Sequence, residues 1–350
     1  MMRHRYLDWL RVISAFAVVA VHVLSHYLSG FPLKGTEWTV TMIAKHSTHF
    51  CIPVFFMITG ALLIKHPGSM TYGEYLKKRF ARIFLPFLIW SFVHWTIIGV
   101  LAKGKAFSVP EFIRLLLCNG ISSQYWYVYA TLVLYLFLPF IGILVTQLSE
   151  KQQKVLIAVM IAVNVILPYI NELLKYFTNW KITNYNMSSL GAYLSYALTG
   201  YALHKMSLPK KKTRWLIYLG GLGSWLVMNI LVWISSKEKY TGLFSETQFP
   251  LSFMMGIAVF IALKAVCETK EASGRNRIIS ILSAESYSAY LTHMLCLRLL
   301  QFIWPTKYVA SLSPYQAAGI MLSEWILALI GCFGISFLVH KLPKRLSSIL

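Results

Sequence analysis

The sequence predicts an all-α, polytopic membrane protein. Three observations lead to this prediction: high hydropathy, few charged residues and a regular series of long apolar segments. Of the 350 residues, 57% are hydrophobic and only 13% are charged, and the mean hydropathy is +0.61. A soluble domain carries about 25% charged residues, and a disordered chain lacks such apolar content. Both classes are therefore excluded, as is a small disulfide-rich scaffold, because five cysteines are too few for this length.

Ten segments are expected to cross the membrane, since a span takes about 20 mostly apolar residues. They are residues 9–29, 44–64, 83–102, 126–147, 155–174, 189–206, 215–235, 250–266, 279–300 and 316–339. The spans are expected to be helices, because lipid cannot satisfy the free backbone groups of an open strand. No connecting segment is long enough for a soluble catalytic domain, so a single domain over residues 1–350 is expected.

The net charge of +21 is explained by membrane topology. In a soluble protein this charge would suggest nucleic acid, but here the basic residues form short clusters between apolar segments. With the N-terminus in the cytoplasm, 22 of the 33 Lys and Arg residues fall on the cytoplasmic side, the bias that the positive-inside rule describes. The sequence thus predicts a multi-pass protein of the cell (plasma or inner) membrane, with both termini cytoplasmic and no nucleic-acid partner.

The first span carries the most informative ionisable residues, which are costly inside a bilayer and are therefore candidates for a functional site. Asp8 precedes Arg11 by three residues, so the two can pair on one helix face. His22 follows Arg11 by three helical turns and lies on the same face, about 16 Å further along. An imidazole can act as a general base near neutral pH. Alternatively, Arg11 anchors the helix at lipid headgroups and His22 bonds to a neighbouring helix.

A basic group opens the third span on the expected cytoplasmic side. Arg79 and Arg82 are three residues apart, so their guanidinium groups project from one helix face, with Lys78 beside them. Two guanidinium groups suit a phosphate-bearing ligand, because each offers a planar fork of donors. Without other evidence, ordinary positive-inside charge is the simpler explanation of the same residues.

Aromatic and polar residues mark two later spans. Trp126 and Tyr127 stand at the outer end of the fourth span, where an aromatic belt or a platform for a carbohydrate or lipid-linked acceptor would explain them. Glu285, Tyr290 and His293 in the ninth span are too polar to face lipid. They are expected to face the interior of the bundle, either as contacts between helices or as the wall of a site.

No metal site is expected. The five cysteines lie mostly in or beside apolar segments and lack the spacing of metal ligands. The outer-side histidines, His22, His26, His46 and His49, also lack the spacing of a closed metal site.

The order of these motifs resembles that of the acyltransferase 3 family, membrane-bound O-acyltransferases that modify surface polysaccharides, peptidoglycan and related glycans. The resemblance covers nearly the whole chain. Its motifs are residues 6–11 with His22 (Arg-x10-His), residues 53–60 (Phe-Phe-x-x-Ser-Gly), Arg79 to Ile83 followed by Pro86 (Arg-x-x-Arg), Tyr125 to Tyr127 with Pro139, and Ser286 to His293. Two residues depart from the pattern: Thr59 replaces the usual serine, and Gln124 stands where many members have histidine.

The resemblance implies a short family form, without an attached esterase-like domain, that takes an acyl group from cytoplasmic acyl-CoA. Acetyl-CoA is the expected donor, with its phosphates on Arg79, Arg82 and Lys78. His22 would act as base or acyl carrier, and Arg11, paired with Asp8, would orient either the donor or the polar side chains below the histidine. The acceptor would be a hydroxyl group of an extracytoplasmic or lipid-linked glycan, bound by Trp126, Tyr127, Tyr290, His293 and Glu285. Other expected partners are membrane lipids and polysaccharide-assembly proteins or a second copy of the chain.

Two other classes of function stay open at this stage. A transporter or exporter of a small polar solute or glycan is the main alternative, although neither the inverted repeats nor the broken helices of many transporters are clear in the sequence. A non-catalytic scaffold in polysaccharide assembly is the other.

Overall fold

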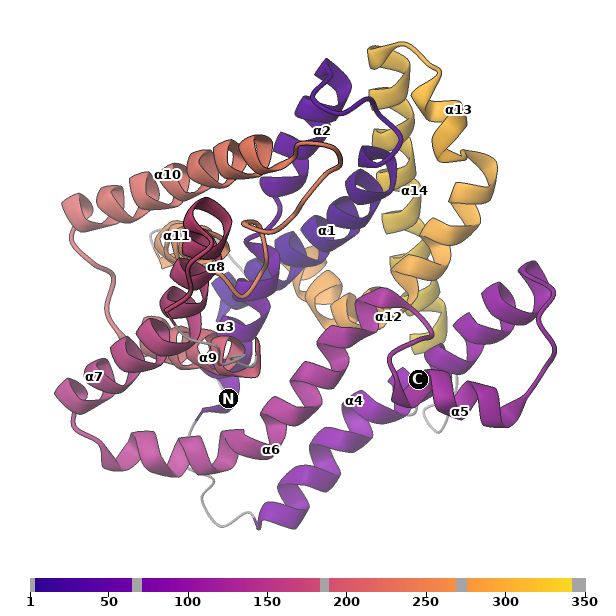
Figure 1. Ribbon diagram of the computed structural model, residues 1–350. Helices are drawn as coiled ribbons and strands as arrows, with labels where there is room; N and C mark the ends of the chain where they lie inside the picture. Colours follow the sequence, from indigo (N-terminus) through magenta and orange to yellow (C-terminus); the bar gives the residue numbers. More distant parts are fainter. Residues whose placement is uncertain (1–3, 65–70, 183–188, 269–275, 342–350) are drawn as a thin grey trace. The chain divides into compact units, whose positions relative to one another are not determined.

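The computed structural model describes residues 4–64, 71–182, 189–268 and 276–341, and all regular secondary structure in these ranges is helical (Figure 1). The chain divides into two compact units, Met1–His66 with Leu138–Ser283 (unit 1) and Pro67–Phe137 with Ala284–Leu350 (unit 2). Two helices, α6 (Trp126–Gln147) and α12 (Arg277–Ile303), contribute residues to both units.

The other helices belong to one unit each. Unit 1 contains α1 (Arg5–Leu28), α2 (Thr36–His46), α3 (Cys51–Leu63), α7 (Glu150–Ile161), η3 (Ala162–Ile166), α8 (Leu167–Thr178), α9 (Ser189–Lys205), α10 (Lys211–Ser235) and α11 (Pro250–Glu268). Unit 2 contains α4 (Tyr72–His94), η1 (Trp95–Ala102), α5 (Val109–Leu117), η2 (Ser123–Tyr125), α13 (Thr306–Ala310) and α14 (Pro314–His340). Both η1 and η3 are π-helical, and η2 is a short 3₁₀ helix.

Eight helical segments are long and apolar enough to cross a membrane, which confirms an all-α fold with many candidate spans. They are Arg5–Leu28, Thr36–Leu63, Tyr72–Ala102, Ser123–Gln147, Glu150–Thr178, Lys211–Ser235, Pro250–Glu268 and Pro314–His340. The two remaining expected spans are also helical: residues 189–206 correspond to α9, which has only 17 residues, and residues 279–300 lie within the more polar α12. The number of ten spans therefore stays a prediction.

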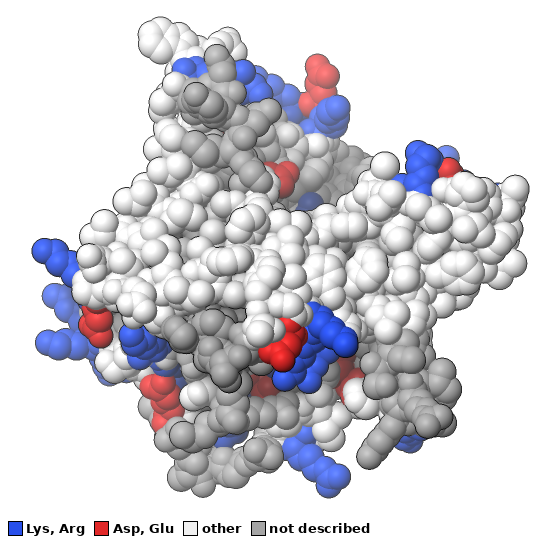
Figure 2. All heavy atoms as spheres, turned by 90° about the horizontal axis from the view of Figure 1, so that it is seen from below, with Lys and Arg blue, Asp and Glu red and all other residues white. Residues whose placement is uncertain are grey.

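The cytoplasmic position of both termini also stays a prediction, because it depends on the distribution of charge. Figure 2 shows Lys and Arg side chains in separate groups among mostly uncharged side chains on the face in view. Several basic residues that contribute to the expected cytoplasmic charge lie outside the described residues: Arg3, Lys65, Lys270, Arg275, Lys344 and Arg345.

The start of α4 illustrates how local sequence sets a helix boundary. Thr71 and Glu74 form a capping box, in which the Thr71 hydroxyl accepts the Glu74 N–H at 3.3 Å and the Glu74 carboxylate accepts the Thr71 N–H at 2.9 Å. Two N–H groups that the first helical turn leaves unpaired are thereby satisfied. The basic residues of the third span follow within the next turns of this helix.

Close packing of two helices forms the centre of unit 1. Helix α3 crosses α9, and α1 packs against α2, α3 and α11 (Figure 1). A Cβ atom on Gly60 would overlap the backbone of Ala197, and one on Gly200 would overlap the backbone of Met57. Glycine at both positions lets the two helix backbones approach, which is a common way for membrane helices to associate.

Replacing Gly60 by alanine is therefore expected to destabilise unit 1 by about 1–3 kcal/mol, the usual cost of overpacking a well-packed core. The matched control is Gly223→Ala on α10, where no atom lies within 4 Å of the added Cβ. This control should be neutral or slightly stabilising, because alanine is the better helix former. Thermal unfolding of the purified protein in detergent measures both changes. Equal melting temperatures for the two variants would contradict the packing argument.

Candidate active site

The predicted catalytic residues all lie on α1 in unit 1. This helix runs for 24 residues without a break, so the spacing of Arg11 and His22 does correspond to three turns of one helix. Asp8 is buried, whereas Arg11 and His22 are half-buried. The three side chains therefore follow one helix from its first turns toward its far end.

Asp8 and Arg11 form the ion pair that their spacing predicts. The Asp8 carboxylate lies 3.9 Å from Nη1 of Arg11 and accepts a hydrogen bond from the Ser283 hydroxyl at 2.7 Å. Nη1 of Arg11 in turn donates to the Ser283 hydroxyl at 3.5 Å. A buried carboxylate needs such partners, since an unpaired charge is expensive away from water. Ser283 on α12 thus helps to hold Arg11 in place, a role that no sequence spacing indicated.

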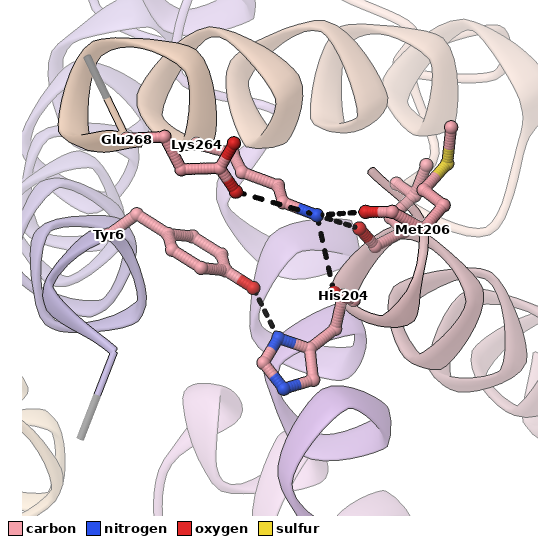
Figure 3. Close-up of polar contacts among 6 residues, drawn as sticks. Tyr6, His204, Met206, Lys264 and Glu268 are labelled. Atoms are coloured by element: carbon pink, nitrogen blue, oxygen red, sulfur yellow. Dashed lines mark hydrogen bonds and ion pairs between the residues drawn. The ribbon is translucent and has the colours of Figure 1, made fainter. Parts of the chain in front are cut away.

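A second polar group holds the beginning of α1, one turn before Arg11 (Figure 3). The Tyr6 hydroxyl is hydrogen bonded to Nδ1 of His204 on α9. Lys264 on α11 is only 3% exposed, and its ammonium group donates to three carbonyl oxygens at the end of α9: Leu203 at 2.8 Å, His204 at 3.2 Å and Met206 at 2.5 Å.

Lys264 therefore acts as a cap for the C-terminal end of α9, where helix carbonyl groups lack partners and favour a positive charge. The Glu268 carboxylate lies 3.8 Å from the same ammonium group (Figure 3). From its position in the sequence, Lys264 is expected only to add to the cytoplasmic charge. The structure instead shows a buried lysine that joins α11 to α9.

The histidines at the end of α2 and in the segment before α3 are bonded to other parts of unit 1. Nδ1 of His46 lies 3.0 Å from Oδ1 of Asn229, and Nδ1 of His49 lies 2.8 Å from the carbonyl oxygen of Ser245. Over the described ranges, no group of three or more His, Cys, Asp or Glu side chains could hold a metal ion. The contacts of His46 and His49 suit a structural role between helices, and the expected absence of a metal stays a prediction.

The three predicted donor-binding residues lie on α4 in unit 2. Lys78 and Arg82 are exposed, and Arg79 is half-buried. The guanidinium group of Arg79 stands over the Tyr75 ring, 5.6 Å from its centroid, which favours one orientation of this side chain. Nearby, the Tyr287 hydroxyl donates to the Ile83 carbonyl oxygen at 2.7 Å and fixes α12 against α4.

Four of the five predicted acceptor-binding residues form a continuous series of ring contacts in unit 2. Ring centroids lie 6.1 Å apart for Trp126 and Tyr127, 5.4 Å for Tyr127 and Tyr290, and 5.4 Å for Tyr290 and His293. The Tyr290 hydroxyl donates to the carbonyl oxygen of Gln124, which joins α12 to the segment before α6. The structure thus brings these four residues together.

Glu285, the fifth predicted acceptor-binding residue, makes its polar contacts with α14 instead. Its buried carboxylate accepts a hydrogen bond from the Ser336 hydroxyl at 2.5 Å and lies 3.1 Å from Nδ1 of His340. These contacts stabilise the packing of α12 on α14. The proposed role of Glu285 at an acceptor stays a prediction.

Comparison with known protein families gives a match over nearly the whole chain. The acyltransferase domain of the acyltransferase 3 family matches residues 4–341, which is essentially the whole chain and includes residues of both units. No curated protein and no solved structure matches the chain. Because the family match covers residues 4–341, the chain belongs to the acyltransferase 3 family and is a membrane acyltransferase.

Proposed function

We propose that this protein transfers an acyl group, most simply acetyl, from cytoplasmic acyl-CoA to a hydroxyl group of an extracytoplasmic or lipid-linked glycan in the cell membrane. Membership of the family supports acyl transfer. The observation that carries the assignment of residues is the ion pair of buried Asp8 with half-buried Arg11, on the helix that also bears His22, together with its contacts to Ser283. It holds a guanidinium group in a fixed position on the face that His22 shares.

In this proposal, His22 is the general base. Its imidazole takes the proton of the acceptor hydroxyl while the oxygen attacks the thioester carbonyl carbon. A carbon–oxygen bond forms, the carbon–sulfur bond breaks, and the CoA thiolate receives the proton from the imidazolium. A two-step route has the same balance: His22 first carries the acyl group as an acyl-imidazole, and the acceptor hydroxyl then displaces it.

Donor binding is assigned to α4 and proton transfer to α1. Arg79 and Arg82, with Lys78, offer donors to the phosphate groups of acyl-CoA, and the contact of Arg79 with Tyr75 supports a prearranged guanidinium group. Arg11, held by Asp8, would orient the donor. This division suits the predicted topology, because an anionic donor from the cytoplasm then meets the basic end of α4.

Acceptor binding is assigned to Trp126, Tyr127, Tyr290 and His293, with Glu285 kept as a further predicted contact. Aromatic rings in mutual contact offer flat apolar faces for a sugar, and this supports a carbohydrate acceptor. An acceptor that meets these rings would approach from the outer side on the predicted topology. Membrane lipids are the other expected partners, since they would surround the spans.

Labelled acetyl-CoA tests this function against its alternatives. The purified protein is added to membranes from cells that lack the gene, and acetyl label is measured in the glycan fraction after mild base release. An acyltransferase should transfer label to this fraction and release CoA. A transporter or a scaffold should do neither, and that result would refute the proposal. Mass spectrometry of surface glycans from cells with and without the gene then identifies the acceptor.

A further inference from the structure

One buried face of α4, which carries Phe87 and the polar residues Ser91 and His94, lies beside the aromatic series of unit 2. Phe87, Ser91 and His94 are four and three residues apart, so they share one helix face, and all three are at most 3% exposed. The Phe87 ring meets the Tyr125 ring edge-on with centroids 5.2 Å apart. The centroid of the His94 ring lies 6.1 Å from that of Tyr125. This face of α4 is therefore turned toward the segment that begins α6.

Hydrogen bonds from tyrosine hydroxyls to backbone carbonyl oxygens hold the surroundings of these residues in place. The Tyr125 hydroxyl donates to the Leu291 carbonyl oxygen at 3.1 Å and lies 3.5 Å from that of Trp90, the neighbour of Ser91. The Tyr290 hydroxyl donates to the carbonyl oxygen of Gln124. The tyrosine hydroxyls are thus used within the protein, where they tie α4, η2 and α12 together.

Three polar side chains of this cluster have buried atoms that remain without a hydrogen-bond partner among the described residues. These atoms are Oγ of Ser91, Nδ1 of His94 and Nε2 of Gln124. Oε1 of Gln124 already accepts a hydrogen bond from the Ser122 hydroxyl at 2.5 Å. The N–H groups of the Gln124 side-chain amide are therefore the part that can still bind a partner. Native proteins leave few buried polar groups unsatisfied, and each such group is a reason to look for a missing partner.

The backbone at this point is also unusual. Helix α4 ends at His94, and the π-helix η1 begins at the next residue, Trp95. Short π-helical segments are rare and occur frequently at functional sites, because the wider turn redirects the side chains next to it. His94 is twelve residues beyond Arg82 on the same helix, which corresponds to about 18 Å. This distance separates the cluster from the predicted phosphate-binding residues.

We propose that Ser91, His94 and Gln124 form a binding site for the hydroxyl groups of a neutral sugar, the acceptor of the acyl group. The inference rests on the proposed function. A hydroxyl, an imidazole nitrogen and an amide N–H₂ together donate and accept hydrogen bonds, as sugar hydroxyls do. The adjacent aromatic rings supply an apolar face for the same ligand. The three residues would hold the acceptor, while His22 would remain the base.

Two variants, Ser91→Ala and His94→Phe, test this site because they remove unsatisfied polar atoms. Replacing such an atom by an apolar group should preserve or raise the melting temperature. Transfer of label from acetyl-CoA to the glycan fraction of membranes should nevertheless fall about tenfold, the value of one lost hydrogen bond. The dissociation constant for acetyl-CoA should stay unchanged. Tyr169→Phe on α8 is the matched control, because it also removes a buried hydroxyl without a partner among the described residues.

The possible outcomes separate this inference from the function on which it depends. The control should keep wild-type transfer, stability and acetyl-CoA binding. Wild-type transfer by Ser91→Ala and His94→Phe would overturn the inference, and so would a parallel loss of stability and acetyl-CoA binding, which indicates a structural cluster. If the wild-type protein binds no acetyl-CoA and transfers no label, the proposed function itself has failed, and the acceptor site fails with it.

Discussion

Replacing His22 by alanine is expected to reduce acyl transfer by about 10²–10⁴-fold, the usual contribution of a general base. The variant should still fold and insert into the membrane, because α1 is held by other contacts. Tyr6 is bonded to His204 at the beginning of the helix, and Asp8 is bonded to Ser283. The loss should therefore appear in the rate of transfer, with the melting temperature and acetyl-CoA binding close to those of the wild-type protein.

His26→Ala is the matched control for this prediction, since it removes an imidazole from the same helix one turn further along. It should transfer acetyl groups within a few-fold of the wild-type rate. Wild-type transfer by His22→Ala would refute the role of His22 as base or acyl carrier. Mass spectrometry of wild-type protein that is quenched during turnover distinguishes the two roles, because only the carrier route adds an acetyl group to the His22 peptide.

The membrane helices could largely be predicted from composition, because length and hydropathy are local properties of a span. Two of the ten expected spans, residues 189–206 and 279–300, are not among the eight candidate spans, and length and hydropathy explain this as well. Helix α9 is short, and α12 is polar, so neither stands out by hydropathy alone. The division into two units could not be predicted. It depends on contacts such as that of Gly60 with Ala197, which are distant in sequence and leave no periodic signal.

In the candidate site, too, the features set by local spacing could be predicted, whereas those set by tertiary contacts could not. The Asp8–Arg11 pair follows from a spacing of three residues on one helix, so the sequence was sufficient. Ser283 was not predicted as the partner of Asp8, because it is 275 residues away and no pattern connects the two. The role of Lys264 could not be predicted for a related reason, since its burial against the end of α9 is a tertiary property. A lysine within an apolar segment was the one available signal.

Replacing Arg82 or Arg79 by alanine is expected to raise the dissociation constant for acetyl-CoA by about 10–100-fold, the value of one lost hydrogen bond to a charged group. Acceptor binding should change much less. Arg82 is exposed at the basic end of α4, and Arg79 is oriented by the Tyr75 ring. Arg82→Lys should recover part of the affinity only, because lysine keeps the charge but loses the planar fork of donors.

Lys77→Ala is the matched control, since it removes an equal charge from the opposite side of the same helix. A phosphate-binding pair predicts that this variant binds acetyl-CoA like the wild-type protein and that only the arginine variants lose affinity. Positive-inside topology depends only on the number of charges. It therefore predicts that replacing Lys77, Arg79 or Arg82 has the same effect on acetyl-CoA affinity. Equilibrium binding of labelled acetyl-CoA at fixed salt measures the affinity of each variant. If Lys77→Ala, Arg79→Ala and Arg82→Ala bind acetyl-CoA with equal affinity, topology is a sufficient explanation for this basic group.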